Sequence, residues 1–370
     1  MNDDTKYLQS QLITYLGNKR TFLPVIEQEI LNIQSLLGKD KTVNVDLFSG
    51  SGCVARMLKQ YSSLIVANDL ERYSQVVNEA FLCNKKDFDM EAYESELTAL
   101  HKLLDDGVRK TGIISTHYAP ADTRHVQPHE RAFYTHENAL LIDTIRWYID
   151  TISNPKLKNM MLAQLLTEAS IHANTSGVFK GFYKDSSTGI GCFGGNGKNA
   201  LQRIMGKISI NKPILSRFES ESMVLKKDAK TLFPASGLRA DITYIDPPYN
   251  QHPYGSNYFM LNLIAENKMP NVVSRVSGIP TDWKRSNYNK KARIRLEFEE
   301  LICSLNTQYA IISYNNEGFL SHDDLLQILS AHGTVLRDQR IEYTAFRASR
   351  NLHKRAKHTQ EYLITVEVTK

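Results

Sequence analysis

The sequence predicts an α/β protein, and three segments lead to this prediction. Residues 43–52 form a short apolar strand that ends in a glycine-rich turn, and residues 53–61 follow with apolar side chains at helical spacing. A second apolar strand covers 64–68, and a third covers 241–245 and ends at Asp246. Strands that alternate with helices are typical of doubly wound sheets, in which ligands bind beyond the carboxyl ends of the strands.

The N-terminal region contributes a polar loop and a helix. Residues 15–20 read Tyr-Leu-Gly-Asn-Lys-Arg, which taken alone is typical of a polar loop. The apolar periodicity that follows predicts a helix over 23–37, with Thr21 as its N-cap and Gly38 at its end.

The glycine turn and the second strand together indicate a ligand site. Gly50 and Gly52 would let a ligand approach the backbone where the helix over 53–61 begins. The turn is not G-x-G-x-x-G, which disfavours a pyrophosphate cofactor. Asp69 ends the second strand, where an acidic residue suits ribose hydroxyls. It equally suits the N-cap of the next helix, and both roles can hold at once.

The stretch from Asp246 to Tyr249 predicts a receptor for a planar group that carries an amine. Pro247 and Pro248 remove two N–H donors and stiffen the backbone. The Asp246 carboxylate and the Pro247 carbonyl are then left as acceptors for the two amine hydrogens, and the Tyr249 ring is available for stacking. The plainer alternative is a rigid turn with a packed tyrosine.

The composition favours a globular protein that can bind nucleic acid. The net charge of +5 is consistent with nucleic-acid binding, and the 42% hydrophobic content is enough for a substantial core. The chain has neither an apolar run near 18 residues nor an N-terminal signal pattern, which predicts a cytoplasmic protein. Its four cysteines show no C-x-x-C pair and no metal-ligand spacing, so we expect free thiols and no metal.

Residues 174–217 are basic and rich in glycine. They hold seven basic residues against one acidic residue, Asp185, and aromatic residues are interleaved. Cations, flexible backbone and flat rings suit a duplex backbone and a distorted base, whereas the alternative is a solvated loop. A second basic cluster, 347–357, precedes a strand expected over 361–368, and it suits phosphate contact or a solvated loop.

Taken together and in this order, the motifs resemble those of the Dam-like (alpha-group) DNA adenine-N6 methyltransferases of restriction–modification systems. The resemblance runs from about residue 15 to the end of the chain. It rests on residues 15–19, 46–52, Asp69, 246–258, 313–316 and 349–352.

This resemblance implies a Rossmann-like S-adenosylmethionine methyltransferase fold with a mixed sheet and a smaller, mostly helical DNA-recognition insertion. Three regions follow: a cofactor-binding half (1–84), a target-recognition insertion (85–218) and a catalytic half (219–370). Periodicity predicts helices over 90–104, 138–152, 156–173 and 293–306, and strands over 222–226 and 309–314.

The resemblance also implies S-adenosylmethionine as cofactor and double-stranded DNA as partner, with the target adenine flipped out of the duplex. A monomer is expected. A cognate restriction endonuclease would belong to the same system without forming a stable complex. The rival functions are an RNA or protein N-methyltransferase with the same amine-holding motif, and a catalytically silent DNA-binding regulator.

Three sets of site residues follow from the motifs and the resemblance. The catalytic set is Asp246, Pro247, Pro248 and Tyr249. The cofactor-binding set is Tyr15, Lys19, Asp46, Phe48, Gly50, Gly52, Asp69, Asp228 and Asp246. Lys19 is expected at the cofactor carboxylate, and Asp228 is expected either at the cofactor adenine or in a solvated turn. The DNA-binding set is Lys180, Lys184, Lys198, Arg203, Lys207, Asn257, Tyr258 and Arg350.

Overall fold

The structure, a computed structural model, describes residues 3–251, 253–283, 285–344 and 358–369. Over these residues one mixed sheet holds seven strands in the order β3-β2-β1-β4-β5-β7-β6. The strands β1 to β5 pair in parallel, whereas β7 runs antiparallel to both β5 and β6. The predicted α/β class with a mixed sheet is confirmed. The strands are β1 (Thr42–Asp46), β2 (Ser62–Asn68), β3 (Glu221–Leu225), β4 (Ala240–Ile245), β5 (Thr307–Asn315), β6 (Gly333–Thr344) and β7 (His358–Val368).

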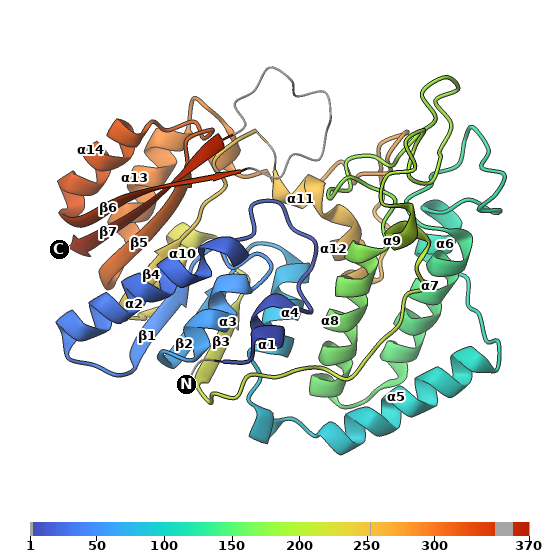
Figure 1. The fold of residues 1–370 in the computed structure, drawn as a ribbon, viewed down its shortest axis with the longest axis horizontal. Helices are drawn as coiled ribbons and strands as arrows, with labels where there is room; N and C mark the ends of the chain where they lie inside the picture. The colour runs from blue at the N-terminus through green and yellow to red at the C-terminus, as the bar shows by residue number, and fades with distance from the viewer. Residues whose placement is uncertain (1–2, 252, 284, 345–357, 370) are drawn as a thin grey trace.

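Helices cover both faces of the sheet (Figure 1). Alternate residues of each central strand face opposite layers. Ile65 of β2 packs with α2 and α3 on one face, whereas Val66 packs with α10, α13 and α14 on the other. The helices beside the sheet are α1 (Thr5–Gln9), α2 (Leu23–Leu37), α3 (Cys53–Lys59), α4 (Arg72–Phe81), α10 (Ala229–Ser236), α13 (Ile294–Ser304) and α14 (His322–His332).

The helix predicted over 23–37 is confirmed as α2, and Gly38 ends it in the left-handed conformation with φ 62°. The predicted cap is wrong. Thr21 lies inside a 3-10 turn, η1 (Arg20–Phe22), and Phe22 occupies the N-cap position without a side-chain hydrogen bond. The turn lets the chain enter the helix continuously, so no separate capping side chain is needed.

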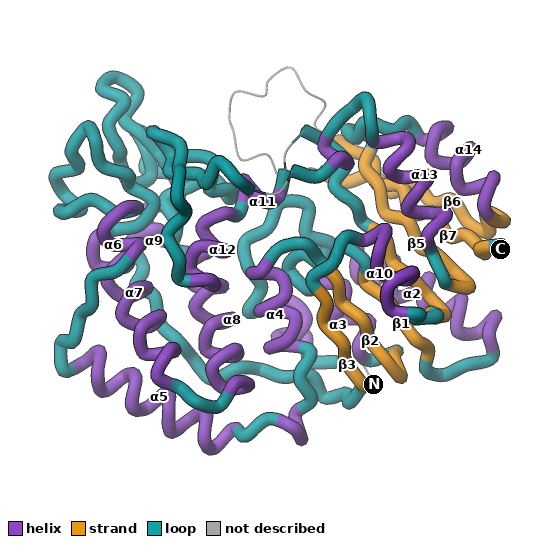
Figure 2. The backbone as a smooth tube through the Cα atoms, turned by 180° about the vertical axis from the view of Figure 1, so that it is seen from behind, coloured by secondary structure: helices purple, strands orange, loops and turns teal. Residues whose placement is uncertain are grey.

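A helical lobe lies beside the sheet, and Figure 2 shows it from behind. Its helices share one core with α4, in which Phe81, Leu165 and Met260 are buried together. The predicted helices over 90–104, 138–152 and 156–173 are present. Packing joins α12 to the lobe, although α12 lies outside the predicted insertion 85–218. The lobe holds α5 (Met90–Asp105), α6 (Ile113–His117), α7 (His136–Thr151), α8 (Pro155–Ile171), α9 (Leu201–Met205), α11 (Tyr254–Asn257) and α12 (Phe259–Glu266); the remaining short helices are η2 (Lys85–Asp87) and η3 (Asn287–Asn289).

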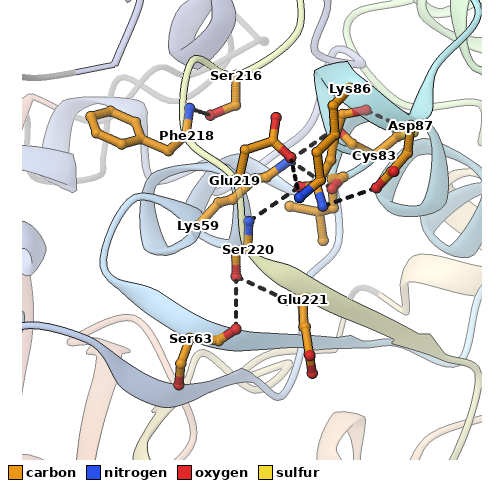
Figure 3. Close-up of polar contacts among 12 residues, drawn as sticks. Lys59, Ser63, Cys83, Lys86, Asp87, Ser216, Phe218, Glu219, Ser220 and Glu221 are labelled. Carbon is orange, nitrogen blue, oxygen red and sulfur yellow. Dashed lines mark hydrogen bonds and ion pairs between the residues drawn. The ribbon is translucent and has the colours of Figure 1, made fainter.

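The two ends of the segment 85–218 lie side by side where it leaves the sheet and returns to it (Figure 3). The Ser220 N–H donates to Asn84 Oδ1 at 3.1 Å, and Lys86 pairs with Glu219 at 3.6 Å. The buried Lys59 amine donates to carbonyls at the end of α4, and burial lowers its pKa to about 8. Because the two ends of the insertion are tied together, the lobe leaves the parallel pairing of β2 with β3 intact. Over the described residues, no helix has both the length and the apolar character needed to cross a membrane.

Candidate active site

A crevice opens at the carboxyl ends of β1 and β4, where the strand order reverses as in other doubly wound sheets. It contains a cavity of about 190 Å³ and a smaller one of about 30 Å³. Both are lined by Tyr15, Phe48 and Asp246. Asp69 and Asp228 line the larger cavity, whereas the smaller one is lined by Lys19, Asp46 and Gly50. Every predicted cofactor-binding residue except Gly52 therefore borders this crevice.

Lys19 lies between two carboxylates. Its amine is 3.0 Å from Asp246 Oδ1 and 2.9 Å from Glu361 Oε1. Burial alone favours the neutral amine, but the two carboxylates outweigh it and hold the pKa of Lys19 well above its usual range. Burial raises the pKa of Asp246 to about 6, with Lys19 opposing and Glu361 adding to the shift. The structure thus places Lys19 at the Asp246 carboxylate, whereas the resemblance suggested the cofactor carboxylate.

The loop from Asp246 to Tyr249 follows β4 and is held in place by the segment after β5. Pro247 is buried, and Pro248 lines the larger cavity. The Tyr249 carbonyl accepts a hydrogen bond from Phe319 N–H at 2.9 Å, and the Tyr249 ring lies 5.7 Å from that of Tyr314. The loop is therefore tied to the segment after β5. Both readings of the motif, a rigid turn and an acceptor site, fit this geometry.

Three tyrosines join the N-terminal loop to the segment that follows the loop from Asp246 to Tyr249. The Tyr15 ring stacks on Tyr254 at 5.0 Å and on Tyr258 at 4.7 Å. The Tyr258 hydroxyl accepts a hydrogen bond from Leu16 N–H at 2.7 Å, and its side chain is fully buried. Stacked rings and a buried hydrogen bond hold Tyr15 in place at the crevice wall.

The two glycines of the turn are required by neighbouring side chains. Gly50 and Gly52 have φ of 47° and 77°. A Cβ at Gly50 would lie 2.9 Å from the Tyr15 ring, and one at Gly52 would lie 2.7 Å from Asn78 Oδ1. The sequence attributed these glycines to close ligand approach, but the structure supplies a nearer cause in the protein itself.

Asp69 holds the glycine turn and also faces the crevice. Its Oδ2 accepts from Gly50 N–H at 2.9 Å, and its Oδ1 accepts from Glu71 N–H at 3.0 Å. Burial raises the pKa of Asp69, although these backbone bonds oppose the shift. Asp228 is similar, because it caps α10 through Lys230 N–H at 3.0 Å and also lines the larger cavity. In both cases the structural role is visible, and the carboxylate still faces the cavity.

Some of the buried polar atoms without partners border the crevice. Among the described residues, both carboxylate oxygens of Asp46, the Tyr288 hydroxyl and Asn289 Oδ1 make no hydrogen bond of normal geometry. Burial raises the pKa of Asp46 well above its usual range, and Asp246 and Asp69 add to the shift, while the nearby backbone N–H groups of residues 48 and 55 only partly oppose it. Leaving a buried polar atom unpaired costs about 1–3 kcal/mol, so a ligand that pairs with these atoms would offset that cost.

The loop around η3 is the part of the site that sequence reasoning missed. Tyr288 packs edge-on against Phe48, with ring centroids 5.6 Å apart, and closes one side of the larger cavity. Ser286, Asn287 and Asn289 line the same cavity. Their sequence is polar and without periodicity, so it signalled only a loop.

The predicted DNA-binding residues fall into two groups. Lys180, Lys184, Lys198 and Lys207 are exposed. Three others point inward, and direct DNA contact is not what their geometry supports. Arg203 donates to the carbonyls of Ala173 and Thr175, each at 3.1 Å, beyond the end of α8. Asn257 and Tyr258 are 3% and 0% exposed. Arg350 lies outside the described residues.

Comparison with known proteins identifies the family. Residues 15–311 match the family described as D12 class N6 adenine-specific DNA methyltransferase. The chain is 31% identical to the type II methyltransferase M.NlaIII of Neisseria lactamica, over 96% of this chain and 100% of that protein. It is 29% identical to the type II methyltransferase M.CviAII of Paramecium bursaria Chlorella virus 1, over 87% and 89% of the two chains. The chain therefore belongs to the D12 class of N6 adenine-specific DNA methyltransferases, and it is a site-specific DNA adenine methyltransferase of the restriction–modification type.

Proposed function

We propose that S-adenosylmethionine is the methyl donor and that the two neighbouring cavities, which share Tyr15, Phe48 and Asp246, hold it. The observation that carries this proposal is the Asp46 carboxylate, which is buried at the end of β1 with both oxygens unpaired among the described residues. An ammonium group is the partner that such a carboxylate accepts best, because a charge-assisted hydrogen bond offsets the cost of burial. The methionine part of the donor carries that ammonium group.

The larger cavity fits the adenosine part. Asp69 and Asp228 face it with carboxylates suited to hydroxyl and amine donors, and Phe48 and Tyr288 supply aromatic walls. When bound, the donor supplies a methyl group on a sulfonium, which is a good leaving group. The Tyr288 hydroxyl and Asn289 Oδ1, which are unpaired among the described residues, would gain partners.

The catalytic loop prepares the acceptor. Asp246 and the Pro247 carbonyl would each take one hydrogen of the adenine N6 amine, which aims the nitrogen lone pair away from them. Lys19 contacts Oδ1 of Asp246, so the amine would use Oδ2. The carboxylate would also stabilise the positive charge that develops on N6. Tyr249 would stack on the flipped base for roughly 1–3 kcal/mol, which offsets part of the cost of flipping.

Duplex DNA is the proposed substrate, and the exposed lysines of the helical lobe are its proposed contacts. A monomer suffices, because one active site can act on each strand in turn. The test is transfer of labelled methyl from S-adenosylmethionine to duplex DNA, with RNA and peptide as competing acceptors. Label in N6-methyladenine of DNA is the expected result, and label in RNA or peptide alone would favour the rival N-methyltransferase function.

Calorimetry tests the donor site separately. Asp46→Asn and Asp69→Ala should each weaken S-adenosylmethionine binding at least tenfold, about 1.4 kcal/mol, while duplex DNA affinity stays unchanged. Asp323→Asn is the matched control, because that side chain is fully exposed on α14. Unchanged donor affinity in Asp46→Asn would return Asp46 to a purely structural role.

A further inference from the structure

We propose that Glu361 is a positioning residue for methyl transfer: it shares the charge of Lys19, so that Lys19 does not fully cancel the charge of the ionised Asp246 carboxylate that faces the target amine. The inference rests on the proposed role of Asp246 as the acceptor of that amine. Glu361 belongs to β7, far in sequence from each of the family motifs in the crevice, and no motif pointed to it.

Glu361 is fixed in place by the sheet. It is 1% exposed and lies opposite Asn315 in the antiparallel pairing of β5 with β7. Its Oε1 accepts from Ser313 Oγ at 2.6 Å, and its Oε2 accepts from Asn315 Nδ2 at 3.4 Å. Asn315 Nδ2 also donates to the Tyr343 hydroxyl at 2.8 Å. These partners are neutral, so they orient the carboxylate without cancelling its charge.

Lys19 is the charged partner that Glu361 has in common with Asp246. One ammonium lies within 3.0 Å of both carboxylates, and its side chain is almost fully buried. The three groups together carry one negative charge. Were Lys19 paired with Asp246 alone, the pair would be neutral, and the amine would meet an acceptor whose charge is already cancelled. Buried charges interact strongly because solvent does not screen them.

The geometry therefore gives Glu361 a purpose beyond stability. Burying a carboxylate costs desolvation free energy. An apolar or amide side chain at this position of β7 would pack in the sheet with a smaller free-energy cost. The Glu361 carboxylate adds a second ion pair to Lys19. It also contributes to the raised pKa of Asp246, in the direction expected of a nearby negative charge.

The first test is Glu361→Gln, which keeps the shape and the hydrogen bonding to Ser313 and removes the charge. The single-turnover methylation rate on cognate duplex DNA should fall about tenfold or more, while S-adenosylmethionine and DNA affinities stay unchanged. Glu361→Asp, which restores the charge, should recover part of the rate. Glu367→Gln is the matched control, because Glu367 lies on the same strand, is exposed, and faces Tyr309 instead of the crevice.

The pH profile gives a readout that a purely structural role would not move. The acidic limb of the Glu361→Gln rate profile should shift to lower pH, since burial still raises the pKa of Asp246 but the added effect of the Glu361 charge is gone. Besides Glu361, the titratable groups facing Asp246 are Lys19, Asp46, Tyr244, Tyr249, Tyr254 and Tyr343. Burial raises the pKa of these four tyrosines, so they stay neutral over the pH range of the profile.

A double variant is the sharpest test. Lys19→Met leaves Asp246 and Glu361 as two carboxylates without their shared cation, and the rate should collapse. Adding Glu361→Gln removes the second carboxylate, so Lys19→Met/Glu361→Gln should be faster than Lys19→Met alone. Additive losses would overturn the proposal, as would a wild-type rate in Glu361→Gln. If instead Asp246→Ala keeps its activity, the proposed role of Asp246 fails, and the two failures are thereby distinguished.

Discussion

Burial and the neighbouring Glu361 raise the pKa of Asp246, whereas Lys19 lowers it, and the resulting pKa is about 6. This value is raised from that of an ordinary aspartate, so the carboxyl is protonated below it and ionised above it. Only the ionised carboxylate can both accept an amine hydrogen and stabilise the positive charge that develops on N6. We therefore expect kcat/KM for methyl transfer to fall as the pH drops through about 6, measured from about pH 5 to pH 8.

Asp246→Ala is the control for this profile. It should abolish methyl transfer and leave the fold and donor binding in place, so no acidic limb should remain to be measured. A variant that keeps more than about a tenth of the wild-type rate has lost under about 1.4 kcal/mol, which is too little for the amine acceptor.

At the scale of one element, the end of α8 depends on Arg203. Its guanidinium donates to the carbonyls of residues 171, 173 and 175, which lie at the end of the helix and just beyond it. Terminal carbonyls need such partners when they are buried. Arg203, which the sequence assigned to DNA binding, therefore serves to close a helix of the lobe.

This assignment predicts a stability effect for Arg203. Arg203→Ala should destabilise the protein by about 1–3 kcal/mol, because buried carbonyls lose their donors. Arg203→Lys should recover only part of this loss, since an ammonium lacks the planar fork of donors. Thermal denaturation measures both variants. An unchanged melting temperature together with a weaker salt dependence of DNA binding would restore the phosphate-contact role.

At the scale of the whole molecule, Lys180, Lys184 and Lys198 are exposed in loops at one end of the lobe. The loops around residues 180–198 lie at the end of the lobe opposite α5 (Figure 1). Lys184 sits over the Phe182 ring at 5.2 Å, which combines a cation with a flat apolar surface. This end of the lobe is on the side of α11, which follows the catalytic loop.

Single alanine substitutions of Lys180, Lys184, Lys198 and Lys207 test this surface. A phosphate contact should reduce the slope of log affinity against log salt by about 0.9, whereas a base contact should relax the target sequence. Binding at several salt concentrations and methylation of mismatched sites separate the two. Lys102→Ala on α5 is the control, because that lysine is exposed at the other end of the lobe. If all four variants behave like the parent, recognition lies elsewhere in the lobe.

Local patterns were enough for much of the fold. The strands at 43–46, 64–68 and 241–245 and the helix α2 follow from short-range apolar periodicity, which tertiary contacts did not override. The convergence of Asp46, Asp69 and Asp246 was also predictable, because parallel strands end at one edge of a sheet. The inward orientation of Arg203 and Tyr258 was not predictable. The residue type alone does not show whether a charged or aromatic side chain faces the solvent or the core.

By itself, the sequence determined the α/β class and the order of the motifs, since each depends on residues close together in the chain. Only the tertiary structure decided that Glu361 meets Lys19, that Tyr288 closes the cavity and that α12 joins the lobe. These contacts come from strand insertion and helix packing between segments far apart in sequence. These contacts form because apolar surfaces of the local elements are still exposed and become buried against each other. A local sequence pattern does not show which of these surfaces will pair.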